Sequence, residues 1–257
     1  MFHVLAWSAD ALGNTANTEV AAVSDDVIEV RDSRYFPFQD LWLWGFYAGA
    51  ATLQRARLFN ASLRNIAQGH IRPVENSLLP PDDPNFRKYL PYPLRFHANE
   101  DIIFDATSGV AMTEQIDALA IFGTSRLPTP VPQGDILTVR ATSTTTAVDT
   151  EWTTVSLTYE QSLPAGRYAL VGSEVQSTNA LFHRWILNTQ GGGIMPYRPG
   201  GMSISAIANR TAMPFYDFSF GVYGYFTSNA LPRLQVFVDG TDNAHVALLQ
   251  VIRLGEL

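Results

Sequence analysis

The side chains best suited to metal binding or proton transfer are the five histidines, His3, His70, His97, His183 and His245. No two of them lie within ten residues of each other, so the sequence has no His-x-His or His-x-x-x-His ligand spacing. It also has no cysteine, which excludes disulfides and thiolate metal sites. Distant histidines of a β-fold can converge on a copper ion, but we expect these to lie apart. No catalytic or metal-binding histidine is predicted.

Carboxylates are the second group that could do chemistry. The loop Asp239-Gly-Thr-Asp-Asn243 offers Asp239 and Asp242 as hard oxygen ligands at the short spacing that Ca²⁺ prefers. Asp-Gly and Asp-Asn are also common in hairpin turns, and we favour the turn. Asp239 and Asp242 are therefore the candidates for a structural calcium ion, and no other cofactor is predicted. Further acidic pairs are Asp25-Asp26, Asp82-Asp83 and Glu100-Asp101.

Motifs that position a nucleophile or a phosphate group are absent. The sequence contains no Gly-x-Ser-x-Gly, no Gly-x-x-x-x-Gly-Lys, and no Gly-x-Gly-x-x-Gly after a strand. Gly191-Gly-Gly193 precedes Ile-Met-Pro and is interpreted as a loop rather than a phosphate-binding turn. We therefore predict that the chain is not an enzyme.

The composition limits the kinds of partner that the chain can bind. The net charge is −7 and Lys88 is the single lysine, so no basic run is available for nucleic acid. Only 16% of the residues are charged, and 12% are aromatic, which is typical of a surface that lies partly against other subunits. The longest apolar stretches, such as Leu41–Ala51, are shorter than the ~20 residues of a membrane-spanning helix. No targeting segment is recognised, and we expect a soluble chain.

Strands must position these residues. Alternating apolar and polar side chains at Leu137–Ala141, Val155–Tyr159 and Phe218–Phe226 predict β-strands. Turn residues recur at about strand length, which is typical of a sandwich or jelly roll.

An internal repeat organises these strands. The proline-rich segment Ser125–Gly134 divides the chain into halves of nearly equal length. Asp40–Phe59 aligns with Arg167–Ile186, which matches Gly45 with Gly172 and Arg57 with Arg184; further along, Ile102–Thr107 aligns with Val236–Thr241. The expected domains are an N-terminal jelly roll at 1–124, a linker at 125–134 and a C-terminal jelly roll at 135–257.

The repeat also decides an ambiguous region. Ala48–Ala67 contains good helix formers, but its counterpart Val175–Leu187 contains Gln-Ser-Thr-Asn, a turn signal between two apolar runs. Both regions are therefore predicted as strand–turn–strand. Short helices are expected in the loops near Ala61–Gln68 and Met202–Asn209.

Two similar β-sandwiches, joined tail to head by a proline linker in a cysteine-free chain, resemble the double jelly-roll major capsid proteins of tailless icosahedral viruses. The compact length of the chain is similar to that of the small capsid proteins of membrane-containing bacterial viruses such as corticoviruses. The stretch most like an individual roll of that family is Pro164–Gly172 running into Ala180–Leu187.

The resemblance implies an all-β fold of two tandem eight-stranded antiparallel jelly rolls. It also implies a homotrimer with a pseudo-hexagonal outline that tiles an icosahedral shell, located in the virion and assembled in the host cytoplasm. The implied partners are further copies of the chain, minor capsid or vertex proteins, and an internal viral membrane, without direct nucleic-acid binding.

Two other classes of function stay open. A carbohydrate-binding or adhesin-type tandem sandwich would expose part of the aromatic clusters as a sugar platform, whereas we expect them in the core or in subunit contacts. An enzyme on two jelly rolls would need converging histidines. The clusters are Tyr35–Phe38, Trp42 with Trp44, and Phe215–Phe218.

Overall fold

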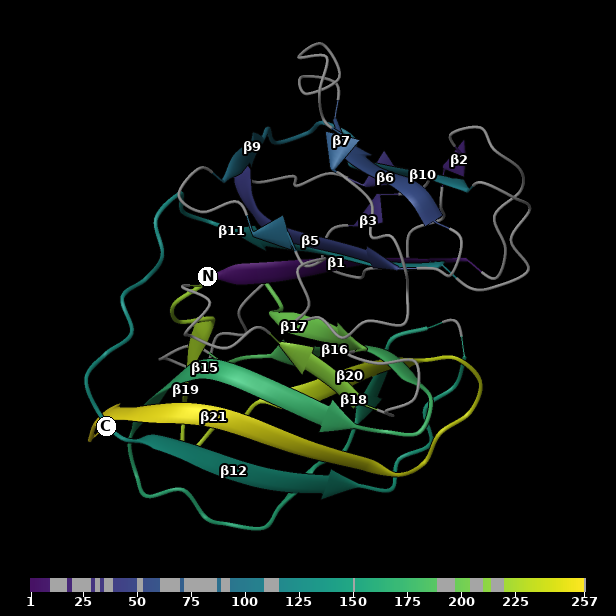
Figure 1. Ribbon diagram of the computed structural model, residues 1–257. Coiled ribbons are helices and arrows are strands. Elements are labelled where there is room, and N and C mark those ends of the chain that lie inside the picture. Colours follow the sequence, from purple (N-terminus) through teal and green to yellow (C-terminus); the bar gives the residue numbers. More distant parts are fainter. Residues whose placement is uncertain are drawn as a thin grey trace. The chain divides into compact units, whose positions relative to one another are not determined.

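We describe a computed structural model of the chain, shown in Figure 1. The structure describes residues 1–9, 18–19, 29–30, 33–34, 39–49, 53–60, 70–71, 87–88, 93–108, 116–149, 151–188, 197–203, 210–213 and 220–256. The chain divides into two compact units. The N-terminal unit is Leu5–Arg126, and the C-terminal unit is Leu127–Leu257 together with Met1–Val4.

The predicted fold class is confirmed: the described residues form antiparallel β-sheets and contain no helix. Accordingly, none of them belongs to a helix of the length and hydropathy that a bilayer requires. In the ambiguous region Ala48–Ala67, Leu53–Phe59 is a strand, as predicted, and 50–52 and 61–67 lie outside the described residues. Of the two expected loop helices, Ala61–Gln68 lies outside the described residues. In the other, Met202 and Ser203 belong to a strand, and 204–209 lie outside the described residues.

The N-terminal unit contains two sheets of four main strands. The first has the order β1 (Phe2–Ala9, which belongs to this unit from Leu5 onward), β11 (Ile116–Gly123), β5 (Leu41–Gly49) and β9 (Leu94–Phe96), with β8 (Arg87–Lys88) also against β5. The second has the order β2 (Thr18–Glu19), β10 (Ile103–Ser108), β6 (Leu53–Phe59) and β7 (His70–Ile71). A separate ribbon pairs β3 (Glu29–Val30) with β4 (Ser33–Arg34).

The C-terminal unit contains the same two orders. One is β12 (Ile136–Ser143), β21 (His245–Gly255), β15 (Arg167–Gln176) and β19 (Gly224–Thr227); the other is β13 (Thr153–Val155), β20 (Arg233–Val238), β16 (Ala180–Ile186) and β17 (Gly200–Ser203). Unlike in the N-terminal unit, the two orders belong to one ten-stranded sheet, because β18 (Arg210–Met213) pairs with both β15 and β17; β14 (Thr158–Tyr159) pairs with β12. In chain order each unit places its first strand beside its last, an arrangement that is also found in jelly rolls.

A shared irregularity strengthens the match between the units. In β5 the ladder with β11 skips Trp44, and in β15 the ladder with β21 skips Val171. Each skipped residue directly precedes one of the two glycines that the sequence matched, Gly45 and Gly172. A β-bulge is specified by local backbone geometry, so its recurrence at the same step of the same strand is a repeat of structure as well as of sequence.

One matched segment needs correction. The sequence aligned Ile102–Thr107 with Val236–Thr241, which equates Asp105 with Asp239. In the ladders Asp105 lies opposite Arg57, whereas Gln235 lies opposite Arg184. The counterpart of Asp105 is therefore Gln235, four positions earlier. The alignment was misled because Asp-Gly-Thr forms the turn after β20, whereas Asp-Ala-Thr lies inside β10.

The proline-rich segment joins the C-terminal unit from Leu127 onward. Val222 N donates a hydrogen bond to Thr129 O at 3.2 Å, and Val131 packs against the cluster around Ile252. Gly221 permits this approach, because it has a positive φ of 80° and a side chain there would meet Thr129 O. The backbone of this segment is thus held against the sandwich.

Candidate functional site

The histidines have separate partners. Arg198 N donates to Nδ1 of His3 at 3.0 Å, and half-buried His97 lies 3.5 Å from the Asp40 carboxylate. His70 lies opposite Arg57 in the β6–β7 ladder. Over the described part of the chain, no group of three or more His, Asp or Glu side chains is placed to hold a metal ion.

His183 is fully buried within a closed polar cluster. Its Nε2 lies 2.8 Å from Ser173 Oγ, its Nδ1 lies 2.7 Å from Thr211 Oγ1, and Trp185 Nε1 donates to the same Ser173 oxygen. Burial lowers the pKa of His183 to about 3, because the charged imidazolium would lose its hydration there. A neutral ring with both nitrogens hydrogen-bonded and no exposure to solvent has a structural role.

The loop predicted for calcium is organised by Asp242. Ser177 Oγ donates to Asp242 Oδ2 at 2.5 Å, and the backbone N–H groups of Asn179 and Ala244 also donate to this carboxylate. Burial raises the pKa of Asp242, but the hydrogen bonds from Ser177, Ala244 and Asn179 lower it by more, so that it lies below the usual range.

Asp239 is less closely bound to this loop. It contributes its backbone N–H to Asn179 O at 2.9 Å, and its side chain is exposed. These contacts are those of a turn, and a calcium ion at Asp239 and Asp242 stays a prediction.

His245 lies next to the Asp242 carboxylate through one hydroxyl. Its Nδ1 is 2.9 Å from Ser177 Oγ and its Nε2 is 3.0 Å from Thr145 O. Ser177 is thus between an imidazole and a carboxylate, and its hydroxyl donates a hydrogen bond to the carboxylate. His245 and Ser177 are buried, so this Ser–His contact is not presented to a substrate.

Buried Arg184 has an unusual set of neighbours. Its Nε donates to Gln235 Oε1 at 2.7 Å, and its guanidinium lies 4.3 Å from the Trp152 ring centroid. Arg198 also donates to Gln235 Oε1, at 2.7 Å. One amide oxygen therefore accepts from two cations, and an aromatic face supplies further stabilisation.

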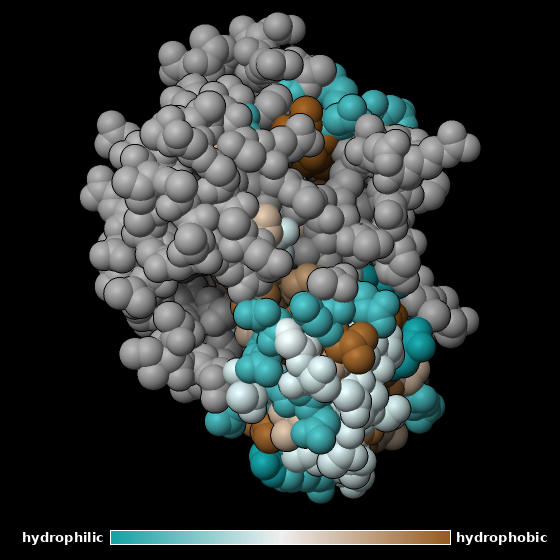
Figure 2. Space-filling view, turned by 90° about the vertical axis from the view of Figure 1, so that its right-hand side faces the viewer, coloured by the Kyte–Doolittle hydropathy of each residue, from teal (hydrophilic) through white to brown (hydrophobic). Residues whose placement is uncertain are grey.

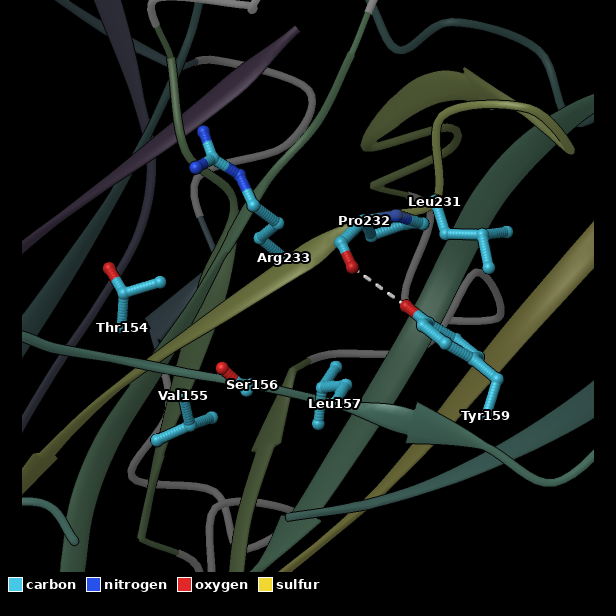
Figure 3. A pocket seen from close by; sticks show the side chains of 8 residues that line it. All are labelled: Thr154, Val155, Ser156, Leu157, Tyr159, Leu231, Pro232 and Arg233. Carbon is cyan, nitrogen blue, oxygen red and sulfur yellow. Dashed lines mark hydrogen bonds between the residues drawn. The ribbon is translucent and has the colours of Figure 1, made fainter. Parts of the chain in front are cut away.

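A surface pocket opens where β13 and β20 separate. Val155 and Leu234 are the last paired residues of this ladder. Continuing the register would bring Leu157 opposite Pro232, which has no N–H to donate, so the ladder ends. The chain then crosses to pair with β12 through Thr158 and Tyr159. A volume of about 430 Å³ lies in the wedge between the separating segments, the β13–β20 pocket (Figure 3).

Tyr159 forms one wall of the β13–β20 pocket. Its hydroxyl donates to Pro232 O at 2.7 Å across the wedge, and burial raises its pKa above the usual range (Figure 3). Leu157 and Leu231, both half-buried, add apolar lining. The pocket can therefore receive an apolar group of side-chain size.

The polar lining lies on exposed residues. Arg233 and Ser156 are both exposed, and Thr154 Oγ1 accepts a hydrogen bond from Gln235 Nε2 at 3.0 Å. Arg233 makes no ion pair with any residue that the structure describes. An apolar lining with one cation suits a carboxylate beside an apolar group. The sequence analysis missed this pocket, and Pro232 directly before the β20 run is the one signal that could have indicated where the ladder ends.

The aromatic clusters are only partly described. Trp44 is buried, and its Nε1 donates to Ser125 O at 2.9 Å; half-buried Trp42 lies under the Arg126 guanidinium. Tyr35–Phe38 and Phe215–Phe218 lie outside the described residues. On the face of the C-terminal unit seen in Figure 2, hydrophobic residues lie singly among hydrophilic and neutral ones.

Comparisons with known proteins identify no family. No family model matches the chain, and no curated protein matches it. Among solved structures, the crystal structure of the major capsid protein P2 from Bacteriophage PM2 aligns over 98% of this chain and 97% of that chain, with 10% sequence identity and a TM-score of 0.26. At that TM-score the alignment adds nothing to the fold assignment, which rests on the strand orders above.

Proposed function

We propose that the chain is a viral major capsid protein of the double jelly-roll type. In this proposal it forms trimers with a pseudo-hexagonal outline, and the trimers tile an icosahedral shell. The observation that carries the proposal is the repetition of one strand order, with one shared bulge, in both units. Two equivalent units per chain give six in a trimer, which approximates sixfold symmetry at the level of the building block.

The polar interior supports a structural role. The buried His183 and Asp242 are fully engaged with neighbouring hydroxyl and backbone groups. Catalysis needs a base within reach of a substrate in an accessible site. The accessible β13–β20 pocket contains a cation and hydroxyls but no histidine or carboxylate. We infer a non-enzymatic protein whose energetics lie in contacts between subunits.

The proposed partners follow from the proposed role. They are further copies of the chain, minor capsid or vertex proteins, and an internal viral membrane beneath the shell. The net charge of −7 disfavours direct packing against nucleic acid. The virion is the proposed location, with assembly in the host cytoplasm.

The native mass of the purified chain tests this proposal. Light scattering at tens of micromolar protein should give three times the chain mass of 28.4 kDa, or a much larger particle. Negative-stain images should show a pseudo-hexagonal outline or a closed shell. A chain that stays monomeric across that concentration range, in ordinary salt, would contradict the proposal.

A further inference from the structure

The β13–β20 pocket combines an apolar lining with a cation that no described carboxylate neutralises. Arg233 is exposed, Ser156 beside it is exposed, and Leu157 and Leu231 line the interior (Figure 3). A guanidinium at the edge of an apolar pocket favours a ligand whose carboxylate lies next to a bulky apolar group. The volume of about 430 Å³ accommodates one or two aliphatic side chains.

The C-terminal unit itself presents a segment of this chemistry. Asp135 is exposed and is followed directly by two large aliphatic side chains at the start of β12. Ile136 is 37% exposed and Leu137 is 39% exposed, although both belong to a strand. They lie on opposite faces of β12, so this end of the strand is apolar on both sides. Asp135 makes no ion pair with any described residue.

The two features fit each other only between copies. Within one copy β12 is paired with β21 along its whole length, from Ile136 opposite Ile252 to Ser143 opposite His245. Its start is therefore fixed in its own sheet, and residues 135–137 do not line the pocket of the same copy. A second copy can bring its Asp135 to Arg233 and its Leu137, which shares a face with Asp135, to Leu157 and Leu231.

We propose that Asp135–Leu137 of one copy docks into the β13–β20 pocket of a second copy. The contact joins two different surfaces of the same unit, so it is heterologous, and repetition closes a ring when the rotation between neighbours fits. This inference rests on the proposed capsid function, because it supplies one of the contacts within the trimer. Other exposed aliphatic residues fit less well: Leu127 and Leu254 each follow an arginine, which would repel Arg233, and Val148 is smaller.

The absence of cysteine allows a direct test in the full chain. The double variant Leu137→Cys/Ser156→Cys places one thiol on each proposed surface, and both positions are exposed. Treatment of the assembled protein with diamide should give disulfide-linked dimers and trimers on non-reducing gels. Each single variant should stay uncrosslinked, and so should the matched control Val148→Cys/Ser156→Cys.

A charge exchange tests the same contact without crosslinking. Arg233→Glu should raise the protein concentration needed for half-assembly by about tenfold, and Asp135→Arg/Arg233→Glu should restore most of the loss. An unmodified chain that assembles, combined with a double-cysteine variant that does not crosslink, overturns the docking proposal and leaves the proposed function standing. Crosslinking of the Val148→Cys control at equal yield also overturns it. A monomeric unmodified chain overturns both.

Discussion

Strand β6 of the N-terminal unit and strand β16 of the C-terminal unit occupy the same place in the same strand order, yet the residues paired with their matched arginines differ. Arg57 lies opposite Asp105, a buried carboxylate, whereas Arg184 lies opposite Gln235, a neutral amide. The bulges before Gly45 and Gly172 are unchanged between the units. The repeat therefore preserves backbone geometry, whereas the residue paired with the matched arginine differs between the two units.

The largest effect should come from removing the neutral amide of Gln235 that the two arginines share in the C-terminal unit. Gln235→Leu removes the oxygen that accepts from both Arg184 and Arg198, and it should lower the free energy of unfolding by about 2–4 kcal/mol. Gln235→Glu brings in the carboxylate of the N-terminal unit and should cost at least ~1 kcal/mol less than Gln235→Leu. Urea denaturation of the full chain measures both. Equal losses for the two variants would show that the guanidinium groups do not depend on this acceptor.

Acid should destabilise the C-terminal unit through His183. The folded pKa of about 3 lies below the ordinary value of 6.5, so the unfolded chain binds a proton that the folded chain rejects. The contribution of His183 is complete above pH 6.5 and is lost as the pH falls toward 3. Between pH 6.5 and 5 the loss should be about 2 kcal/mol.

The matched position of the N-terminal unit is Ala56, which cannot titrate. Urea midpoints at pH 7, 6 and 5 should therefore fall more steeply for the unmodified chain than for His183→Gln, which keeps a hydrogen-bonding side chain without the titration. Parallel pH profiles of the two proteins would contradict the assignment of the acid sensitivity to His183.

The smallest effect should come from an exposed pair that only the N-terminal unit has. Arg95 on β9 pairs with Asp40, where the C-terminal unit has Tyr225 packed on an apolar cluster. Arg95→Ala should cost at most about 0.5 kcal/mol, because the Arg95 side chain is 52% exposed. Asp40 also accepts from Ala98 N at 2.7 Å, a bond that lowers the pKa of Asp40 most. Asp40→Ala, which loses both bonds, should cost more; thermal melts compare the two.

The sequence predicted the strands better than it predicted their registers. The strand Leu53–Phe59 could be recognised because its counterpart contains a turn signal, although its own residues favour a helix. The sequence alignment of β10 with β20 was wrong by four residues, because it relied on an Asp-Gly-Thr turn that lies beyond the end of β20. The polar clusters could not be foreseen, because Ser173, His183 and Thr211 converge only after three strands have paired.

The β13–β20 pocket shows a second limit. Its existence depends on Pro232 falling opposite Leu157, and that opposition is a property of the ladder rather than of either segment. A short apolar run after a proline is common, and by itself it indicates a strand start. The pairing of Val155 with Leu234 is needed to show that the ladder ends before Pro232 and that the two segments separate there.

The bulges at Trp44 and Val171 also determine how the deletion of a single residue would affect β5 and β15. Each adds one residue to its strand relative to the partner, so side chains before and after it follow opposite inside–outside phases. Deleting Val171 would leave Leu170 opposite Val251 and Gly172 opposite Gln250, so the other side chains would keep their present faces. A single deletion elsewhere in β15 would instead turn the side chains on one side of it to the other face. Trp44 and Val171 are therefore the positions at which a one-residue deletion preserves the register, and deletions elsewhere in β5 and β15 preserve it only in pairs.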